Sequence, residues 1–295
     1  MKSSNIGGQA VMEGIMMRSG DQYSIGVRKP DGEIEVKVEP YRSWAKDSSI
    51  WKLPVFRGVA SFFESLVVGI RCLMYSASFI EDEEEDAKKP GKEKTEEQKE
   101  KEEKWLMYGT MTFSVIFSIA LFIMLPYFLA GFLRNVTTSE GVIAVAEACV
   151  RMILFLGYLV LISRMKDIQR VFMYHGAEHK CINCVEHGLE LNVENVMKSS
   201  REHKRCGTSF LLFVMIVSII FFLFIRVSSP VLRVVIRLLL MPVIAGVSYE
   251  IIRLAGKSDN KIVALLSKPG LMLQHLTTRE PEPEMAEVAI AAVEA

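Results

Sequence analysis

The sequence predicts a mainly α-helical polytopic membrane protein, with four transmembrane helices in two hairpins and a small α+β module on one side of the membrane. Four apolar stretches each reach the roughly 20 residues that span a bilayer core. The connectors within each pair are only a few residues long, whereas a long polar stretch, 164–207, separates the two pairs. The predicted spans are residues 105–133, 141–163, 208–227 and 231–254.

The distribution of Lys and Arg predicts the orientation of these spans. Of the 35 basic residues, 17 lie in residues 1–104, 8 in residues 164–207 and 5 in residues 253–295. Cytoplasmic segments carry an excess of Lys and Arg, so we expect both termini and the central loop to be cytoplasmic. The first apolar span begins after residue 100, so no cleavable signal peptide is expected. The five Cys residues, mostly on the reducing side, do not require disulfides.

The amino-terminal segment, 1–50, contains a predicted β-hairpin. The run QYSIGVRKPDGEIEVKVEPY has two alternating stretches on either side of Pro30, Asp31 and Gly32. Alternation of apolar and polar residues around such a turn is typical of a hairpin, here with about five residues in each arm. We expect it to form part of the small cytoplasmic module.

Residues 51–80 are apolar at helical spacing but carry three charges on one face. Arg57, Glu64 and Arg71 recur every seven residues. Burying each of them at mid-bilayer costs roughly 2.5–3.5 kcal/mol on the insertion scale. This cost favours an interfacial or re-entrant helix over a fifth span.

Two polar segments complete the organisation. Residues 81–104 alternate in charge and lack apolar side chains, which predicts a solvated linker or an exposed helix. Residues 255–295 form a cytoplasmic tail, in which we expect a short amphipathic turn, a break at Pro269 and Gly270, and a small terminal helix.

Charged residues inside the spans have a structural interpretation. Glu147 and Arg151 are four residues apart and are expected to pair with each other. Arg233 and Arg237 begin the fourth span, where long side chains can extend toward lipid phosphates.

The most informative motif is YHGAEHKCINC, residues 174–184, which reads H-x-x-E-H. In a helix, His175 and His179 lie one turn apart on the same face, with Glu178 beside them. This is the arrangement of an inverted zinc-peptidase motif, in which imidazole nitrogens bind the metal and the carboxylate acts as base. The alternative is a polar cluster that caps the helix at the membrane surface.

Further ligands are expected among four residues. His203 and Cys206 directly precede a span and can return to the surface where the two His residues lie. Glu250 competes with them, although a salt bridge to Arg253 explains it equally well. Glu13, flanked by glycine, ranks lower. The expected cofactor is a divalent metal, with zinc first.

A second metal-binding pattern uses the cysteines. Cys181 and Cys184, followed by His203 and Cys206, have the spacing of a structural zinc knuckle. These two hypotheses share His203 and Cys206 and differ in the other two ligands. His187, beside a glycine, is expected to be a surface residue.

The chain resembles one known family over nearly its whole length. Its motifs match, in order, those of the YqhQ family of bacterial membrane proteins, a domain of unknown function (1385) labelled a predicted metal-dependent enzyme. One departure is Lys204, where the resemblance implies proline. The resemblance implies a multi-pass protein of the bacterial inner membrane. The matching strings are GGQAVMEGIMMR, VRKPDGEI, YHGAEHK, VENV, RCGTSFLL, GVSYEI and LTTREP.

Two functions of different class fit these observations. The first is a metal-dependent hydrolase that acts at the cytoplasmic membrane surface on a peptide, lipid or lipid-linked substrate, with His175, His179 and His203 as ligands and Glu178 as base. The second is a non-enzymatic membrane partner or scaffold, for example in membrane-protein insertion or quality control beside the translocon. The lipid bilayer is a partner in both cases, and no nucleic acid is expected for a chain of net charge zero.

The predicted topology is testable by cysteine labelling. Single Cys probes in a Cys-free background should react from outside the cell at Thr138, and at Ser48 and Ser199 only after permeabilisation, because the basic segments remain cytoplasmic. Labelling of Ser199 in intact cells would contradict this topology.

Overall fold

In the computed structural model, the described residues are 4, 6–43, 49–87, 96–225, 227, 229–257 and 260–295. Ser48, Arg226 and the middle of the predicted linker, residues 88–95, lie outside them. The chain divides into two compact units, and several helices contribute segments to both. The first comprises Met1–Asp82, Leu159–Ser218 and Leu239–Ala295, and the second Glu83–Tyr158 and Ile219–Leu238.

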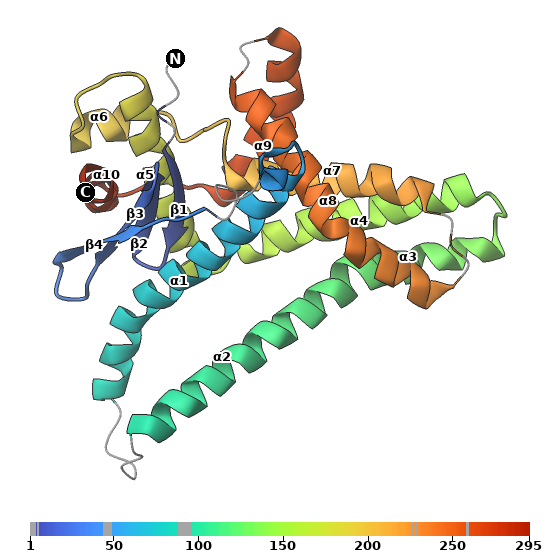
Figure 1. Ribbon diagram of the computed structural model, residues 1–295, viewed down its shortest axis with the longest axis horizontal. Helices are drawn as coiled ribbons and strands as arrows, with labels where there is room; N and C mark the ends of the chain where they lie inside the picture. Colours follow the sequence, from blue (N-terminus) through green and yellow to red (C-terminus); the bar gives the residue numbers. More distant parts are fainter. Residues whose placement is uncertain are drawn as a thin grey trace. The chain divides into compact units, whose positions relative to one another are not determined.

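The first unit contains a four-stranded antiparallel sheet in the order β1-β2-β3-β4 (Figure 1). The predicted hairpin is confirmed as β3 and β4, with seven residues in each strand rather than five. Two further strands precede this hairpin, within residues 7–19, and they were not predicted from the sequence. The strands are β1 (Gly7–Val11), β2 (Gly14–Ser19), β3 (Gln22–Arg28) and β4 (Ile34–Pro40).

Helix α1 (Phe56–Ala87) covers one face of the sheet. Val68 and Cys72 of the helix pack on a buried cluster of strand residues, with Tyr75 and Phe79 at its border. Glu64, buried in the helix, accepts hydrogen bonds from the hydroxyls of Tyr41 and Ser43. The strand residues in this cluster are Val11, Met16, Tyr23, Ile25 and Val27.

Helices α5 (Lys166–Glu186) and α10 (Pro283–Glu294) cover the opposite face. Ile15 and Met17 of β2 point to this side and pack against buried residues of both helices. Neighbouring Met16 points to the α1 side, so β2 is apolar on both faces. A continuous apolar run is the pattern of a strand covered on both faces, and it hides the alternation by which half-buried strands are recognised.

The amino-terminal end of α1 packs closely on helix α8 (Pro230–Lys257). A Cβ atom at Gly58 would lie 2.7 Å from the carbonyl oxygen of Gly246, so the two backbones are nearly in contact. Arg57 forms an ion pair with Glu250 beside this crossing, with Nε 2.6 Å from Oε1. Two of the three charges on the predicted charged face of α1, Arg57 and Glu64, therefore have partners within the protein.

Three shorter elements complete the first unit. The predicted break at Pro269 and Gly270 is wrong, because both residues lie inside helix α9. A Cβ atom at Gly270 would lie 2.7 Å from Oγ of Ser209, so glycine here permits a close approach of α9 to Ser209. The elements are η2 (Ile50–Lys52), α6 (Val193–Lys198) and α9 (Lys261–Thr277).

The second unit is built from apolar helices. The predicted pair of Glu147 and Arg151 is confirmed, with 2.6 Å between Oε1 and a guanidinium nitrogen. Arg237 also binds Glu147, at 2.6 Å, and is buried rather than extended toward lipid phosphates. Its elements, some shared with the first unit, are α2 (Glu96–Ile119), the π-helical turn η3 (Ala120–Met124), α3 (Leu125–Gly131), η4 (Phe132–Asn135), α4 (Glu140–Ile162), α7 (Gly207–Phe224) and α8.

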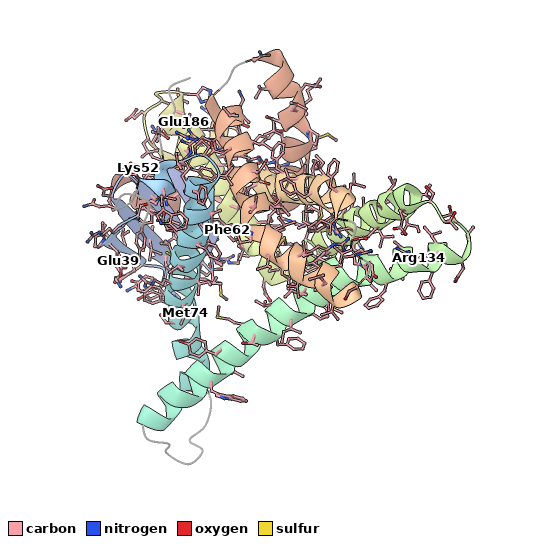
Figure 2. All side chains as sticks on the ribbon, turned by 45° about the vertical axis from the view of Figure 1, so that its right-hand side comes forward. Glu39, Lys52, Phe62, Met74, Arg134 and Glu186 are labelled. Atoms are coloured by element: carbon pink, nitrogen blue, oxygen red, sulfur yellow. The ribbon has the colours of Figure 1, made fainter. Side chains whose placement is uncertain are left out.

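Five helices among the described residues are long and apolar enough to cross a membrane. Four of them coincide with the predicted spans. The fifth is the segment for which the sequence favoured an interfacial or re-entrant helix, and Figure 2 labels Phe62 and Met74 within it. The five are Phe56–Phe79, Tyr108–Asn135, Glu140–Ile162, Gly207–Phe224 and Val231–Gly256.

Two helical glycines should respond oppositely to substitution. At Gly176 of α5 a Cβ atom would overlap the carbonyl oxygen of Arg279, whereas at Gly157 nothing lies within 4 Å. We expect Gly176→Ala to lower the free energy of unfolding by about 1–3 kcal/mol through overpacking. Gly157→Ala should be neutral or stabilising by up to about 1 kcal/mol. Denaturant unfolding of the detergent-purified variants measures both, and equal stabilities would contradict the close packing of α5.

Candidate metal centre

Helix α5 carries the H-x-x-E-H motif through the interior of the first unit. Every residue from Gly176 to Cys184 is buried, so this part of the helix has no solvent-facing side. Buried polar side chains must find hydrogen-bond partners within the protein. The partners of the two histidines define the chemistry of the site.

Each of the two imidazoles is held through Nδ1 by a backbone carbonyl. Nδ1 of His175 lies 2.8 Å from the oxygen of Thr277, and Nδ1 of His179 lies 2.5 Å from the oxygen of Arg201. A carbonyl oxygen can only accept a hydrogen bond, so both Nδ1 atoms must carry the proton. The neutral form of each ring then presents an unprotonated Nε2 atom, which is the tautomer that binds metals.

Cys206 completes the cluster from the start of helix α7. Its Sγ lies 3.3 Å from Nε2 of His175 and accepts a hydrogen bond from the backbone N–H of Thr208, at 3.3 Å. A sulfur that receives an amide hydrogen bond at a helix N-terminus is placed where negative charge is favoured. One ligand atom from each of His175, His179 and Cys206 lies within 4.8 Å of the other two.

The donor set fits zinc. Two imidazole nitrogens and one thiolate are ligands that zinc prefers, and three protein ligands leave a fourth position of a tetrahedral site open. The ring centroids of His175 and His179 are 4.5 Å apart, so both rings face the same small volume. The carbonyls of Thr277 and Arg201 supply the outer hydrogen bonds that commonly orient metal-bound histidines.

Glu178 lies beside the cluster without a fixed partner. Its side chain is buried, and burial raises the pKa of the carboxyl to about 7, an effect that His175 partly opposes. In the described part of the chain no hydrogen bond or ion pair engages this carboxyl. Gly8 of β1 leaves room for it, since a Cβ atom there would lie 2.6–2.7 Å from atoms of the Glu178 side chain.

His203 lies next to the cluster but its ring nitrogen is turned to another partner. Its ring centroid is 5.7 Å from that of His179, and its Nε2 lies 3.5 Å from a carboxylate oxygen of Glu186. Glu186 also accepts hydrogen bonds from Arg205 and from the N–H and hydroxyl of Ser4. Burial, with His179 and Arg205 nearby, lowers the pKa of His203 to about 4 and keeps the ring neutral.

The other two acidic candidates are paired elsewhere. Glu250 binds Arg57 and lies 3.9 Å from Arg253, so the predicted salt bridge to Arg253 is the weaker of its two contacts. Glu13, whose backbone has a φ of 50°, binds Arg170 and accepts a hydrogen bond from the hydroxyl of Tyr174 at 3.3 Å. The structure brings neither carboxylate into the His175–His179–Cys206 cluster.

The cysteines of the knuckle hypothesis are core residues. Cys181 and Cys184 are fully buried among apolar side chains of the sheet, α6 and α10. Burial raises the pKa of Cys181 to about 12 and also raises that of Cys184, which disfavours the thiolates that a metal requires. Among the described residues, the thiol that lies close to His175 and His179 is that of Cys206.

Several residues that support the site carry no recognisable sequence signal. Gln274 of α9 holds the backbone of His203 on both sides, at 3.0 Å from its N–H and 2.8 Å from its carbonyl. Lys180 and Asn183 of α5 donate to carbonyls of residues 197–202. Thr277, whose carbonyl orients His175, lies in the string LTTREP of the family resemblance. That string is the one sequence feature that points to this carbonyl.

A cavity of about 440 Å³ is lined by residues of the two chain segments whose carbonyls hold the imidazoles. Arg201 and Thr278 line it, and the carbonyls of Arg201 and neighbouring Thr277 hold the two imidazoles. Arg279 and His275 give its wall a basic character, offset by Glu280, which pairs with Lys180 at 2.6 Å. Its volume lies in the range typical of small-molecule sites.

These features define a class of protein: a chain of membrane-type helices with a small sheet-containing unit that carries a buried His-His-Cys cluster. The chain belongs to the family described as Protein of unknown function (DUF1385), which matches residues 53–295. It is 39% identical over 286 residues to the uncharacterized protein YqhQ of Bacillus subtilis (strain 168), covering 96% of this chain and 89% of that protein. No solved structure matches the chain. The predicted resemblance is confirmed.

Metal content should depend on the three clustered residues. We expect about one equivalent of zinc or another divalent ion in the purified protein, and loss of that metal in the His175→Ala/His179→Ala variant and in Cys206→Ser, because each change removes a donor atom. His187→Ala and Cys184→Ala alter residues outside the cluster and should retain it. Elemental analysis of the detergent-purified proteins measures the content. Retention by Cys206→Ser with loss by Cys184→Ala would contradict this ligand set.

Proposed function

We propose that the chain is a metal-dependent hydrolase of the cytoplasmic membrane surface, with His175, His179 and Cys206 as metal ligands and Glu178 as general base. The observation that carries the proposal is the pair of Nδ1–carbonyl hydrogen bonds, which leaves the Nε2 atoms to face other groups, that of His175 lying 3.3 Å from the Cys206 sulfur. Cys206 replaces His203, the third ligand favoured from the sequence, because the His203 ring faces Glu186.

The roles of the residues follow from their positions. A bound divalent ion would supply Lewis-acid polarisation of a substrate carbonyl or phosphoryl oxygen. Glu178 would accept the proton of the attacking water and return it to the leaving group, since it is next to His179 on α5 and its carboxyl has no hydrogen bond or ion pair among the described residues. Gly8 keeps space for that side chain, and the carbonyls of Thr277 and Arg201 fix the two rings.

The neighbouring cavity favours an anionic substrate. Arg201 and Arg279 line it with His275, and the single carboxylate in its wall, Glu280, is already paired with Lys180. Guanidinium groups recognise phosphate and carboxylate through charge-assisted hydrogen bonds. Among the substrates considered from the sequence, a phosphate-bearing lipid or lipid-linked molecule fits this wall better than a neutral peptide.

The same proposal places the first unit beside the cytoplasmic leaflet of the bacterial inner membrane. Helix α1 packs on the sheet from Val68 to Phe79, so a spanning α1 would draw a sheet with charged strand residues into the hydrocarbon core. An interfacial α1 avoids this cost and lets its exposed apolar side chains enter the lipid. Those side chains include Phe63, Leu66, Leu73 and Met74.

One observation favours a second candidate, a non-enzymatic membrane partner. Glu178, His179 and Cys206 are each exposed by no more than 5%. Structural metal sites are closed, whereas catalytic sites must admit a substrate. In this case the cluster would stabilise the first unit, and a partner membrane protein, for example one of the insertion or quality-control machinery, would bind elsewhere.

The substitution Glu178→Gln separates the two candidates. It preserves the shape of the side chain but removes the base, so an enzyme should lose activity by about 10²–10⁴-fold while its metal content and abundance stay unchanged. Glu194→Gln, an exposed carboxylate on α6, is the matched control. Complementation of a deletion strain at equal protein level provides the measurement. Full complementation by Glu178→Gln would exclude the hydrolase and favour the partner.

A further inference from the structure

Three charged side chains are buried together in the second unit, within candidate membrane spans. Glu147 and Arg151 lie on α4, and Arg237 lies on α8. Their side chains are 9%, 4% and 4% exposed. Both guanidinium groups bind Glu147, and the carbon atom of each lies 4.8 Å from the centre of the Phe222 ring.

The charges of this cluster do not balance. Two guanidinium groups share one carboxylate, which leaves one positive charge in excess. Between residues 105 and 158 and between 219 and 238 the chain has one other acidic residue, Glu140, and it is exposed and paired with Arg134. Because Arg remains protonated in proteins, the excess cannot be removed by loss of a proton. A buried charge requires a counter-charge.

The cluster also holds an unused donor beside a cavity. Nε of Arg237 is buried and has no hydrogen-bond partner among the described residues, whereas Nε of Arg151 donates to the carbonyl of Phe122 at 3.2 Å. Arg237 lines a cavity of about 10 Å³ together with Glu147, Arg151 and Phe222. Ala144 and Ala148 complete the α4 side of its wall.

We propose that this cavity is an anion site that holds one monatomic anion of the size of chloride beside Arg237. A volume of about 10 Å³ has room for one particle of about the size of a water molecule, which is too little for phosphate, carboxylate ligands or lipid headgroups. A water molecule would satisfy Nε–H of Arg237, but it would leave the excess charge in place. A monovalent anion satisfies both requirements, and it would lock α4 to α8 through the cluster.

Bromide, which replaces chloride and scatters anomalously, provides the direct test. Crystals of the full chain grown in bromide should show one anomalous peak beside Arg237. In solution, chloride should raise the midpoint of thermal unfolding of the detergent-purified protein by roughly 2–4 °C relative to gluconate at equal ionic strength. A cavity without an anomalous peak would show that water fills it and would overturn the proposal.

Variants test whether the chloride dependence of unfolding arises at this cavity. Arg237→Met leaves the neutral pair of Glu147 and Arg151, so its unfolding midpoint should no longer depend on chloride. Ala148→Leu keeps every charge and fills the cavity, and it should also abolish both the dependence and the bromide peak, which covers the case in which Arg237→Met does not fold. Arg134→Gln removes an exposed pair of the same unit and should keep the dependence. Undiminished chloride dependence in Ala148→Leu would overturn the proposal.

Discussion

The first unit depends on one set of interactions, the hydrogen bonds that the buried helix α5 donates to backbone carbonyls. His179, Lys180 and Asn183 bind carbonyls between residues 197 and 202, and His175 binds the carbonyl of Thr277. These carbonyls lie in the last turns of α6 and α9 or in the loop of residues 199–202, where regular helical hydrogen bonding ends, so the α5 side chains serve as their partners. The same bonds fix the tautomers of both histidines. The proposed metal binding and the folding of the loop would thus depend on one constraint, because a donor lost from α5 leaves a buried carbonyl unsatisfied.

The sequence was most informative where one physical pattern acted alone. Four apolar helices and the β3–β4 hairpin were predicted because segment length, hydropathy and turn residues indicate local structure directly. Strands β1 and β2 were not, since Ile15, Met16 and Met17 are buried toward both α5 and α1 and give no alternation. The helix through Pro269 was also missed. There Gly270 packs closely on Ser209, a contact between residues distant in the chain that no local sequence signal indicates.

The candidate site shows the same division. The helical spacing of His175, Glu178 and His179 was readable from the sequence, which also named Cys206 as a candidate ligand. The choice among His203, Cys206, Glu13 and Glu250 was not, because it depends on partners distant in the chain. Glu186, Arg170 and Arg57 engage the other three, and their pairing can be seen only once α5, β1 and α8 are folded. Which carbonyls orient the imidazoles is likewise a property of the tertiary structure.

Helix α10 has a consequence for the order of biosynthesis. Met285, Val288 and Ala289 close the core against strands formed by the first 28 residues, with the apolar helices between them in the chain. A ribosome must therefore release residue 294 before the amino-terminal sheet can bury its α5-facing side. Helix α5 can cover part of that side earlier, but Ile15 and Met17 lack their α10 neighbours while α7 and α8 leave the ribosome. Apolar surface that stays uncovered in this way is aggregation-prone and is the kind that chaperones shield in nascent chains.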